Sequence, residues 1–295
     1  MRRVAFLLAL ATPLPLAPAL ARPMAIEASS APTYDFTVGA LRLTALNDGQ
    51  AIRPNDGKTL SPVAGVARVL AGAGLPTASF KLGLGGLLVR DGARTILIDT
   101  GLGPHGGADG GKLAAALATA GVAPGAVTDI VISHPHFDHI GGLLTADGKS
   151  AFPNAQVHLS SAAWDALRAK APPEMIAAIT PRLALLPADS VIAPGVRAVS
   201  IPGHTPGHIG VEIESRGQRL LYVGDTVHQY VASVAAPDLD MAYDEDGPTA
   251  KASRKALLAR AADQHLRLYA PHFPFPGLGT VKRDGDTYAW VPEAR

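Results

Sequence analysis

The sequence contains no cysteine among its 295 residues. This absence excludes disulfide bonds, so the folded chain must depend on its hydrophobic core and on any metal ions that it binds. Thiolate is excluded as a metal ligand and as a nucleophile. The formal net charge is only +1, which gives no basic surface for nucleic acid or an anionic membrane. With 47% hydrophobic residues, the chain can bury a sizeable core in one large α/β domain or two small ones.

The N-terminus also lacks an apolar run long enough to span a bilayer, because prolines interrupt it. It has a basic start (Met1-Arg2-Arg3), a short apolar run (Val4–Leu10) and a small-residue end (Ala19-Leu20-Ala21), the three parts of a signal peptide. We expect removal of residues 1–21, with a periplasmic or secreted product that keeps no membrane anchor. The arginine pair leaves twin-arginine export open beside the general route. Residues 22–33, rich in Ala, Pro and Ser, are expected to be a flexible lead-in to one domain at 34–295.

The densest chemical signal in the sequence is His134-Pro135-His136-Phe137-Asp138-His139, which follows the apolar run Ile130–Ile132. Imidazole and carboxylate are ligands that suit zinc and its neighbours. His134 and His136 are two residues apart, so they point to the same side of an extended chain. Asp138 and His139 follow where the chain can turn, so they can face a second ion. One segment can therefore supply ligands to two metals.

Three later segments repeat this arrangement of a polar residue after a short apolar run. They contain His204 in Gly203–His208, Asp225 in Gly224–Thr226 and His272 in Pro271–Pro274. Strand ends that open into loops commonly carry functional residues. Single histidines are more often surface or core residues, and a structural zinc is usually closed by four ligands. The recurrence in four segments favours an open site for two metals over both alternatives.

The ordered set HxHxDH, GHTPGH, GD and a late histidine resembles the metallo-β-lactamase superfamily over roughly residues 34–293. Asp99-Thr100-Gly101 and Leu46-Asn47-Asp48-Gly49 resemble early motifs of that family. The resemblance implies an α/β fold of the four-layer αββα sandwich type. It also implies the ligands of two divalent ions, with Zn²⁺ as the first expectation. One ion would be held by His134, His136 and His204, the other by Asp138, His139 and His272, and Asp225 would bridge them.

The implied activity is that of a metal-dependent hydrolase. Two divalent ions can share and ionise a water, lowering its pKa from about 15.7 towards 7. The resulting hydroxide would attack an ester, lactone or phosphotriester, with Asp138 and Asp225 as the catalytic carboxylates. An iron-dependent redox enzyme of the same superfamily is one alternative, although His136 stands where the di-iron flavoprotein branch has a carboxylate. A non-catalytic zinc-binding module is another, although none of the seven ligands is missing.

Within the superfamily, the chain most resembles the methyl parathion hydrolase group, through Thr44–Gly49, Ala151–Ala155 and Phe275–Gly279. That resemblance places Trp164 at a position where the group has an aromatic that packs on its substrate. Three further pocket candidates are placed by their neighbours: His105 in the loop after Asp99–Gly101, His228 three residues after Asp225, and Phe273 beside His272. Each could equally be structural: Trp164 and Phe273 in the core, His105 in a solvated loop. The glycine-rich stretch Pro104–Gly107 departs from the group, which has a pocket phenylalanine there. The partner is expected to be a small-molecule substrate, with no nucleic acid, and a homodimer is a further expectation by analogy.

Periodicity and turn residues predict a layered arrangement of strands interrupted by helices. The predicted strands are Phe36–Ala45, Leu84–Val89 and Thr95–Ile98 as a hairpin, Ile130–Ile132, Val157–Leu159, Val196–Ile201, His208–Ile213, Leu220–Val223, Leu266–Ala270 and a closing hairpin within Thr280–Trp290. The predicted helices are Lys112–Ala120, Ser161–Lys170 and Thr249–Ala262. Residues 50–80 resist assignment and are interpreted as a loop near the site or a dimer contact. His208 is expected to support the metal ligands, and His158 and His265 to be structural.

Overall fold

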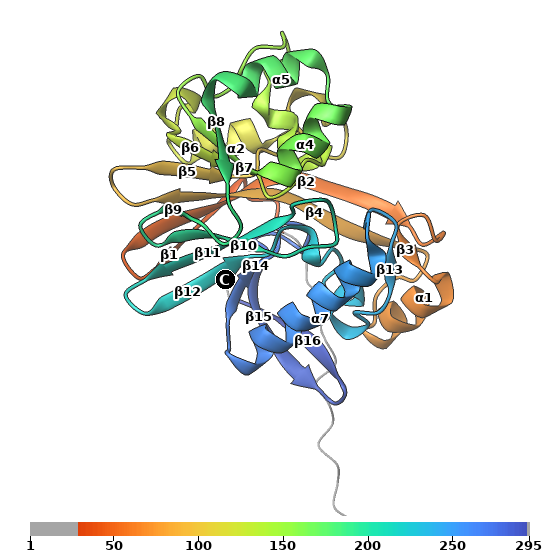
Figure 1. Cartoon of the computed structure of the whole chain (residues 1–295). Helices are drawn as coiled ribbons and strands as arrows, with labels where there is room; N and C mark the ends of the chain where they lie inside the picture. Colours follow the sequence, from red (N-terminus) through yellow and green to blue (C-terminus); the bar gives the residue numbers. More distant parts are fainter. Residues whose placement is uncertain (1–28, 294–295) are drawn as a thin grey trace, which may run out of the picture.

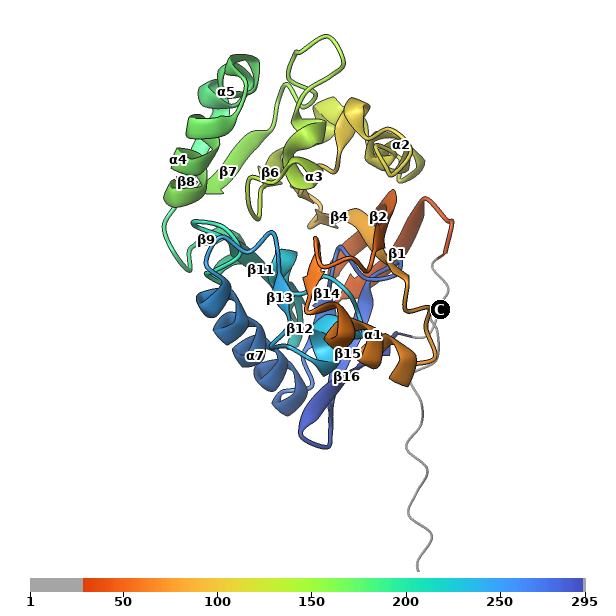
Figure 2. The ribbon, with the colours of Figure 1, turned by 90° about the vertical axis from the view of Figure 1, so that its right-hand side faces the viewer.

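Two seven-stranded sheets lie face to face at the centre of the computed structural model, which describes residues 29–293. Helices cover the outer face of each sheet, so the layers run helix, sheet, sheet, helix (Figures 1 and 2). This is the predicted four-layer αββα sandwich. None of the helices among the described residues is long and apolar enough to cross a membrane. The predicted signal peptide and most of the predicted lead-in lie outside the described residues.

The first sheet is built by the N-terminal half of the described chain. Its strand order is β1-β2-β4-β5-β6-β7-β8. The bounds are β1 (Thr33–Val38), β2 (Leu41–Pro54), β4 (Ser79–Arg90), β5 (Thr95–Ile98), β6 (Asp129–Val131), β7 (Gln156–Ser160) and β8 (Leu183–Leu186). Strands β5 to β8 pair in parallel. Parallel strands covered on both faces are continuously apolar, as in Ile96–Ile98, which is entirely buried.

The second sheet is built by the C-terminal half. Its order is β16-β15-β14-β12-β11-β10-β9. The bounds are β9 (Val191–Ala193), β10 (Val196–Ser200), β11 (Ile209–Ser215), β12 (Gln218–Tyr222), β14 (Arg267–Tyr269), β15 (Leu278–Asp284) and β16 (Thr287–Pro292), and a two-stranded sheet joins β3 (Leu60–Ser61) to β13 (Asp240–Met241). Leu43 and Ile98 from the first sheet and Val211 and Tyr222 from the second belong to one buried cluster. The main core therefore lies between the sheets.

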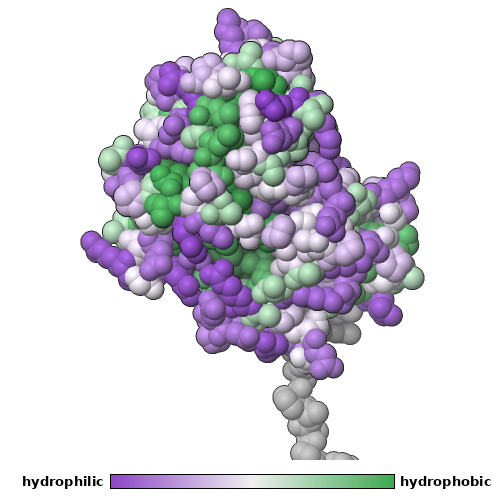
Figure 3. All heavy atoms as spheres, viewed as in Figure 1, coloured by the Kyte–Doolittle hydropathy of each residue, from purple (hydrophilic) through white to green (hydrophobic). Residues whose placement is uncertain are grey.

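Helices close both outer faces with separate hydrophobic clusters. Their bounds are α1 (Val63–Gly72), α2 (Leu113–Thr119), α3 (Phe137–Ile140), α4 (Ser161–Lys170), α5 (Pro173–Ile179), α6 (Ala232–Ala235) and α7 (Gly247–Asp263). Leu117 and Trp164 pack on the first sheet with Leu97. Leu258 of α7 packs on the second sheet with Leu268. In the view of Figure 3, apolar residues gather over the edge strands β8 and β9, where Leu185 and Val191 are exposed.

Helix α7 begins at a well-formed cap. The carboxylate of Asp246 accepts a hydrogen bond from the Thr249 backbone N–H at 3.1 Å, which satisfies one of the free donors of the first turn. The buried face of α7 consists of alanines and leucines and one arginine, namely Ala250, Arg254, Leu257, Leu258, Ala261 and Ala262. Gly203 lets the helix approach closely, because a Cβ at that position would lie 2.2 Å from the Ala250 nitrogen.

The structure confirms most predicted elements within a few residues, including the three helices and the closing hairpin. Ser160 is the cap of α4, accepting from the Ala163 N–H at 3.1 Å. The single strand predicted at Phe36–Ala45 was wrong, because the chain turns at Gly39, where φ is +57°. β1 ends at Val38 and β2 begins at Leu41 as its antiparallel partner.

The interpretation of residues 50–80 as a loop was also wrong. β2 continues to Pro54 and pairs with β4 as far as Ser79, and α1 lies between them. The frequent Gly, Pro and Ala of this stretch weaken the hydrophobic patterns of both the strand and the helix. Contacts with the domain also reach residues of the predicted lead-in, while the boundary at residue 34 stays a prediction. The carbonyls of Ser29 and Ala31 already accept hydrogen bonds from the side chain of Asn47.

Both sheets send loops to the same edge of the sandwich. His134 follows β6 and α3 comes next, which places four polar residues at the end of the first sheet. His204 follows β10, Asp225 follows β12 and His272 follows β14, at the end of the second sheet. The site described next therefore forms where the two halves of the chain meet.

Candidate metal centre

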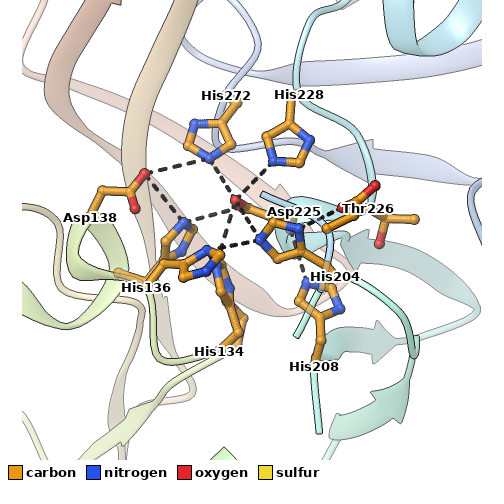
Figure 4. Close-up of polar contacts among 12 residues, drawn as sticks. His134, His136, Asp138, His204, His208, Asp225, Thr226, His228 and His272 are labelled. Atoms are coloured by element: carbon orange, nitrogen blue, oxygen red, sulfur yellow. Dashed lines mark hydrogen bonds and ion pairs between the residues drawn. The ribbon is translucent and has the colours of Figure 1, made fainter. Parts of the chain in front are cut away.

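Histidine and aspartate side chains from these loops converge around Asp225, and most of them are labelled in Figure 4. They are the seven predicted metal ligands, His134, His136, Asp138, His139, His204, Asp225 and His272. Two groups among them bring one ligand atom from each residue within 4.8 Å of the others: His134, His136, His204 and Asp225 form the first, and Asp138, His139 and His272 the second. The division into two groups is the predicted one.

The first group has the dimensions of a zinc site. The His136 Nδ1 lies 3.1 Å from the His134 Nε2 and 3.0 Å from the His204 Nε2. The Asp225 Oδ2 lies 3.6 Å from the His134 Nε2 and 3.4 Å from the His204 Nε2. Tetrahedral zinc with bonds of about 2.0–2.1 Å separates its ligand atoms by about 3.3 Å. The separations of the four donors are therefore close to those that a single zinc ion requires.

The second group is similar in size and shares Asp225. The His139 Nε2 lies 3.1 Å from the Asp225 Oδ1, and the His272 Nε2 lies 3.0 Å from the Asp225 Oδ2. The Asp138 Oδ2 is 3.6 Å from both of these imidazole nitrogens. Asp225 thus contacts members of both groups, as a bridging carboxylate must. Asp138, with 27% of its side chain exposed, is the carboxylate of the site that reaches solvent.

Hydrogen bonds behind the imidazoles fix their orientation. The His139 Nδ1–H donates to the Asp99 Oδ2 at 2.7 Å. The His134 Nδ1 lies 3.0 Å from the Ser133 hydroxyl, which itself donates to Asp99 at 2.6 Å. Because that hydroxyl has given its proton to the carboxylate, it accepts from the His134 Nδ1–H. Both rings therefore turn the lone pair of Nε2 towards the centre.

The same rule holds for the histidines of the second sheet. The His204 Nδ1–H donates to the Asp244 Oδ1 at 2.8 Å, and the His272 Nδ1–H donates to the Gly83 carbonyl at 2.8 Å. His208 has a supporting role, as predicted. Its Nδ1–H donates to the Ile201 carbonyl at 2.8 Å and its Nε2 accepts from the Asp225 N–H at 3.0 Å. The turn that carries the bridging carboxylate is thereby held in place.

Two buried atoms of the site call for a cation. Among residues 29–293, the His139 Nε2 and the Asp225 Oδ1 find no hydrogen-bond partner, although they lie 3.1 Å apart. Because the His139 Nδ1–H donates to Asp99, the Nε2 of a neutral His139 carries a lone pair, which faces a lone pair of the Asp225 Oδ1. A buried pair of this kind is unfavourable unless a positive charge lies between. Four carboxylates (Asp99, Asp138, Asp225 and Asp244) surround the site against one guanidinium, so the residues present fit two divalent cations.

The pKa values reflect this crowding. Burial alone would raise the pKa of Asp225, but the surrounding imidazoles, His272 first, hold it well below its usual range. Burial opposes protonation of His204, yet the hydrogen bonds of Asp225 and Asp244 raise its pKa to about 8. His139 behaves likewise, because Asp225 and Asp138 outweigh burial and raise its pKa well above the ordinary value. Protons therefore compete with metal ions for these imidazoles.

His228 joins the site, as the sequence allowed. Its Nε2 lies 3.2 Å from the Asp225 Oδ2, and its ring stacks on His272 with centroids 5.3 Å apart. With Asp225 and His272 it forms a third group of donors. Burial lowers the pKa of His228 to about 4, so the ring is neutral. Neither of its nitrogens has a hydrogen-bond partner among the described residues, and the tautomer is therefore free to adapt.

The other predicted pocket residues lie elsewhere. Trp164 is 7% exposed and packs in the cluster between α4 and the first sheet. Phe273 is 2% exposed and packs edge-on against Trp290. His105 is exposed in the glycine-rich loop and has no polar contact with the ligands. These positions favour the structural alternatives for Trp164 and Phe273, while substrate contact by the three residues stays a prediction. His158 is structural, with its Nε2 2.9 Å from Asp129.

The two early motifs act behind the site. Asp99 supports both His134 and His139, as described. The buried carboxylate of Asp48 accepts from the N–H groups of Leu102 and Leu113 at 2.9 and 2.7 Å. It thereby clamps both ends of the glycine-rich loop, which packs on the metal-binding segment where a Cβ on Gly103 would lie 2.3 Å from the Gly141 carbonyl.

Sequence reasoning missed Asp244 and Arg254. Asp244 orients His204 and pairs with the Arg254 guanidinium at 2.9 Å. Asp244 lies in an acidic loop without a motif, so nothing in its neighbourhood marked it. Arg254 did leave a signal, because it occupies a core position in the Ala/Leu stripe of α7. A charged residue at such a position is expected to be paired and hydrogen-bonded.

Comparison with protein families gives one match. The family model described as Metallo-beta-lactamase superfamily matches residues 87–272. Curated relatives include the N-acyl homoserine lactonase of a Bacillus species, 34% identical over 98 residues, which are 32% of this chain and 36% of the relative. The N-acyl homoserine lactonase of Bacillus cereus is 30% identical over 37% of this chain and 42% of its own. The chain thus matches well under half the length of these two relatives.

Solved structures match over much more of the chain. AidC, a dizinc quorum-quenching lactonase in complex with the product N-hexanoyl-L-homoserine, is 30% identical with a TM-score of 0.83, covering 89% of this chain and 98% of its own. AbOPH, a hydrolase in the beta lactamase superfamily, is 27% identical with a TM-score of 0.82, covering 90% of this chain and 99% of its own.

Proposed function

Because this chain belongs to the metallo-β-lactamase superfamily, we propose that it is a two-metal hydrolase that opens the lactone ring of N-acyl homoserine lactones. The observation that carries the proposal is the pair of donor groups sharing Asp225, with four imidazoles turned inward by hydrogen bonds at their Nδ1 atoms. A closed structural site would need only one such group. The choice of lactone rests on the similarity to AidC, which covers 89% of this chain.

The metal ions have defined places in this proposal. His134, His136 and His204 would hold one ion, Asp138, His139 and His272 the other, with Asp225 between them. When bound, the ions supply an activated water and polarise the carbonyl of the lactone. Zinc is the metal we propose, since imidazole and carboxylate without thiolate suit it, and AidC is a dizinc enzyme.

Three residues of the chain would supply negative charge, accept and return the proton of the water, and donate a hydrogen bond. Asp225 is buried and its pKa lies well below its usual range, so it stays ionised and would offer an anion to both metal ions. Asp138 is the partly exposed carboxylate and its Oδ2 is the atom placed to accept the proton of the attacking water. Returning that proton to the ring oxygen of the opened lactone completes hydrolysis and leaves Asp138 ionised. Neutral His228, with an unpaired nitrogen at the same centre, can donate a hydrogen bond to an oxygen that gains charge.

The substrate class is tested by a panel of N-acyl homoserine lactones, aryl esters and phosphotriesters, assayed with the chelated and the zinc-reconstituted protein. We expect lactone hydrolysis that chelation abolishes and zinc restores, and none in the His136→Ala control. Preference for a phosphotriester would instead support the methyl parathion hydrolase-like assignment, which stays a prediction. Iron binding with oxygen uptake would revive the redox alternative. Full zinc binding with no turnover of any ester would favour the non-catalytic module.

We also propose that the protein is exported. The support is the signal-peptide pattern of residues 1–21. Mass spectrometry of the N-terminus after expression in a Gram-negative host tests this proposal. A mature chain beginning after Ala21 is expected in the periplasmic or secreted fraction. An intact Met1 in the cytoplasmic fraction would refute it.

A further inference from the structure

Arg254 is among the most deeply buried charged side chains of the described residues, at 2% exposure. Its guanidinium donates four hydrogen bonds. Nε donates to the Thr226 carbonyl at 2.9 Å, Nη1 to the carbonyls of Pro237 and Leu239 at 3.0 and 3.1 Å, and Nη2 to the Asp244 Oδ2 at 2.9 Å. A buried cation is costly unless it is paired in this way. No step of the proposed reaction uses it.

One branch of these contacts leads to the first group of metal ligands. Asp244 receives the Arg254 guanidinium on one oxygen and the His204 Nδ1–H on the other. The ion pair is almost entirely buried, with 2% of the Arg254 side chain and 1% of the Asp244 side chain exposed. Its carboxylate therefore has one orientation, and that orientation aims the Nε2 of His204 at the metal position. A ligating histidine depends on such a partner for its tautomer and its ring angle.

The other branch leads to the bridging ligand. Thr226, whose carbonyl accepts from the Arg254 Nε, immediately follows Asp225 in the 3₁₀ turn Gly224–Thr226. On the opposite side, the Asp225 N–H is bound by His208. The turn is therefore held between a helix of the outer layer and a loop of the sheet. Any displacement of Arg254 would move the one carboxylate that both groups of donors share.

We propose that Arg254 is a positioning residue that sets the geometry of both metal sites, through Asp244 for His204 and through Thr226 for Asp225. Arginine suits this task, since its planar fork serves several acceptors at fixed angles. Lysine has one nitrogen and cannot reach the three segments together. The inference rests on the metal-binding part of the proposed function and not on the substrate.

The two branches make different predictions for metal affinity, measured by titrating Zn²⁺ into the chelated full-length protein against a competing chelator. Asp244→Asn tests the His204 branch. With its amide oxygen accepting from Arg254, its NH2 group faces the His204 Nδ1–H, which loses its acceptor, while the Arg254 bond to the Thr226 carbonyl is kept. We expect one ion to bind about 10- to 100-fold more weakly and the other to bind as before. Arg254→Lys breaks both branches, so both ions should bind more weakly. Arg260→Lys is the matched control, since Arg260 lies on the same helix as Arg254 but pairs with Glu212 of β11, and its variant should bind both ions normally.

Co²⁺ titration gives a second readout, because its absorption bands change with the coordination of each site. The proposal is overturned if Arg254→Lys binds both ions with wild-type affinity, or if it weakens only the ion that Asp244→Asn weakens. Should Arg254→Lys fail to fold, Asp244→Asn still decides the first branch, and an equal loss of both ions there would refute it. No substrate enters these measurements. A protein that hydrolyses no lactone but shows the predicted affinities would refute the proposed function alone.

Discussion

Replacing Asp99 by asparagine should weaken both the fold and the metal site. The carboxylate of Asp99 is fully buried and accepts four hydrogen bonds, from the Ser133 N–H and O–H, the His139 Nδ1–H and the Tyr222 hydroxyl, all at 2.6–2.7 Å. Its backbone is left-handed, with φ +59°. Asparagine tolerates that conformation better than most residues, so the change tests the carboxylate and not the backbone.

The magnitude follows from which oxygen accepts which donor. Oδ2 accepts from the Ser133 hydroxyl, the His139 Nδ1–H and the Tyr222 hydroxyl. Oδ1 accepts from the Ser133 backbone N–H. The amide is best placed with its oxygen at the Oδ2 position, which leaves the buried Ser133 N–H unpaired and facing the amide NH2 group, at a cost of about 1–3 kcal/mol. The three remaining bonds lose the charge that made them about twice as strong. We expect a total loss of about 3–5 kcal/mol of unfolding free energy.

Zinc affinity should fall as well, by about 10- to 100-fold, since His139 loses a negatively charged partner and His134 depends on Asp99 through the Ser133 hydroxyl. Urea unfolding of the chelated protein measures the first effect and competitive zinc titration the second. Tyr222→Phe is the control, since it removes one donor, costs about 1.5–3 kcal/mol and touches no metal ligand. An Asp99→Asn protein that binds zinc as tightly as wild type would refute the role assigned to this carboxylate.

Three further predictions follow from the geometry. Zinc affinity should fall as the pH drops below about 8, up to about tenfold per unit for each proton displaced, because Asp225 and Asp244 raise the pKa of His204 to about 8. In the chelated protein the same raised pKa stabilises the fold below its unfolded value of 6.5, and that contribution disappears as the pH rises through about 8. Affinity that is flat between about pH 6 and 8.5 would contradict this assignment. Trp164→Ala should cost about 3–5 kcal/mol of stability, measured by urea unfolding, without changing the KM for lactones. A raised KM with little loss of stability would instead place Trp164 in the substrate pocket. Gly203→Ala should cost about 1–3 kcal/mol of stability and weaken zinc binding, since its Cβ would lie 2.2 Å from the Ala250 nitrogen at the start of α7. A variant with wild-type melting temperature and zinc affinity would contradict this expectation.

Much of the metal centre could be predicted from the sequence because each ligand segment has a recognisable local pattern. His134–His139 is dense in donors, and His204, Asp225 and His272 each follow an apolar run that ends at the same edge of the sandwich. The supporting residues give no such local sign. Asp244 is one acidic residue among several, and only the folded chain brings it to His204. The arginine in the stripe of α7 could have been noticed, but its four acceptors lie on three distant segments.

The fold was predictable where hydrophobic periodicity was strong and failed where it was diluted. The buried strand at Ile130–Val131 and the helix at Ser161–Lys170 have clear patterns and were found. The long pairing of β2 with β4 runs through alternating glycines such as Gly83 and Gly85, which weaken the strand signal. The Gly83 carbonyl accepts from His272, and a Cβ there would lie 2.3 Å from the Phe273 carbonyl. Close approach to the site, and not strand propensity, accounts for glycine at this position.

Because each donor group draws on both sheets, a bound ion would join the two halves of the chain as a cross-link does. His136 and His204, whose ring nitrogens lie 3.0 Å apart, are separated by 68 residues of sequence. Closing a loop of that length in the unfolded chain corresponds to about 4 kcal/mol in the chain-entropy model used for disulfides. In a protein without cysteine, the metal pair would thus contribute the same kind of restraint. Resistance to unfolding and to proteolysis should then rise with the zinc concentration around the protein.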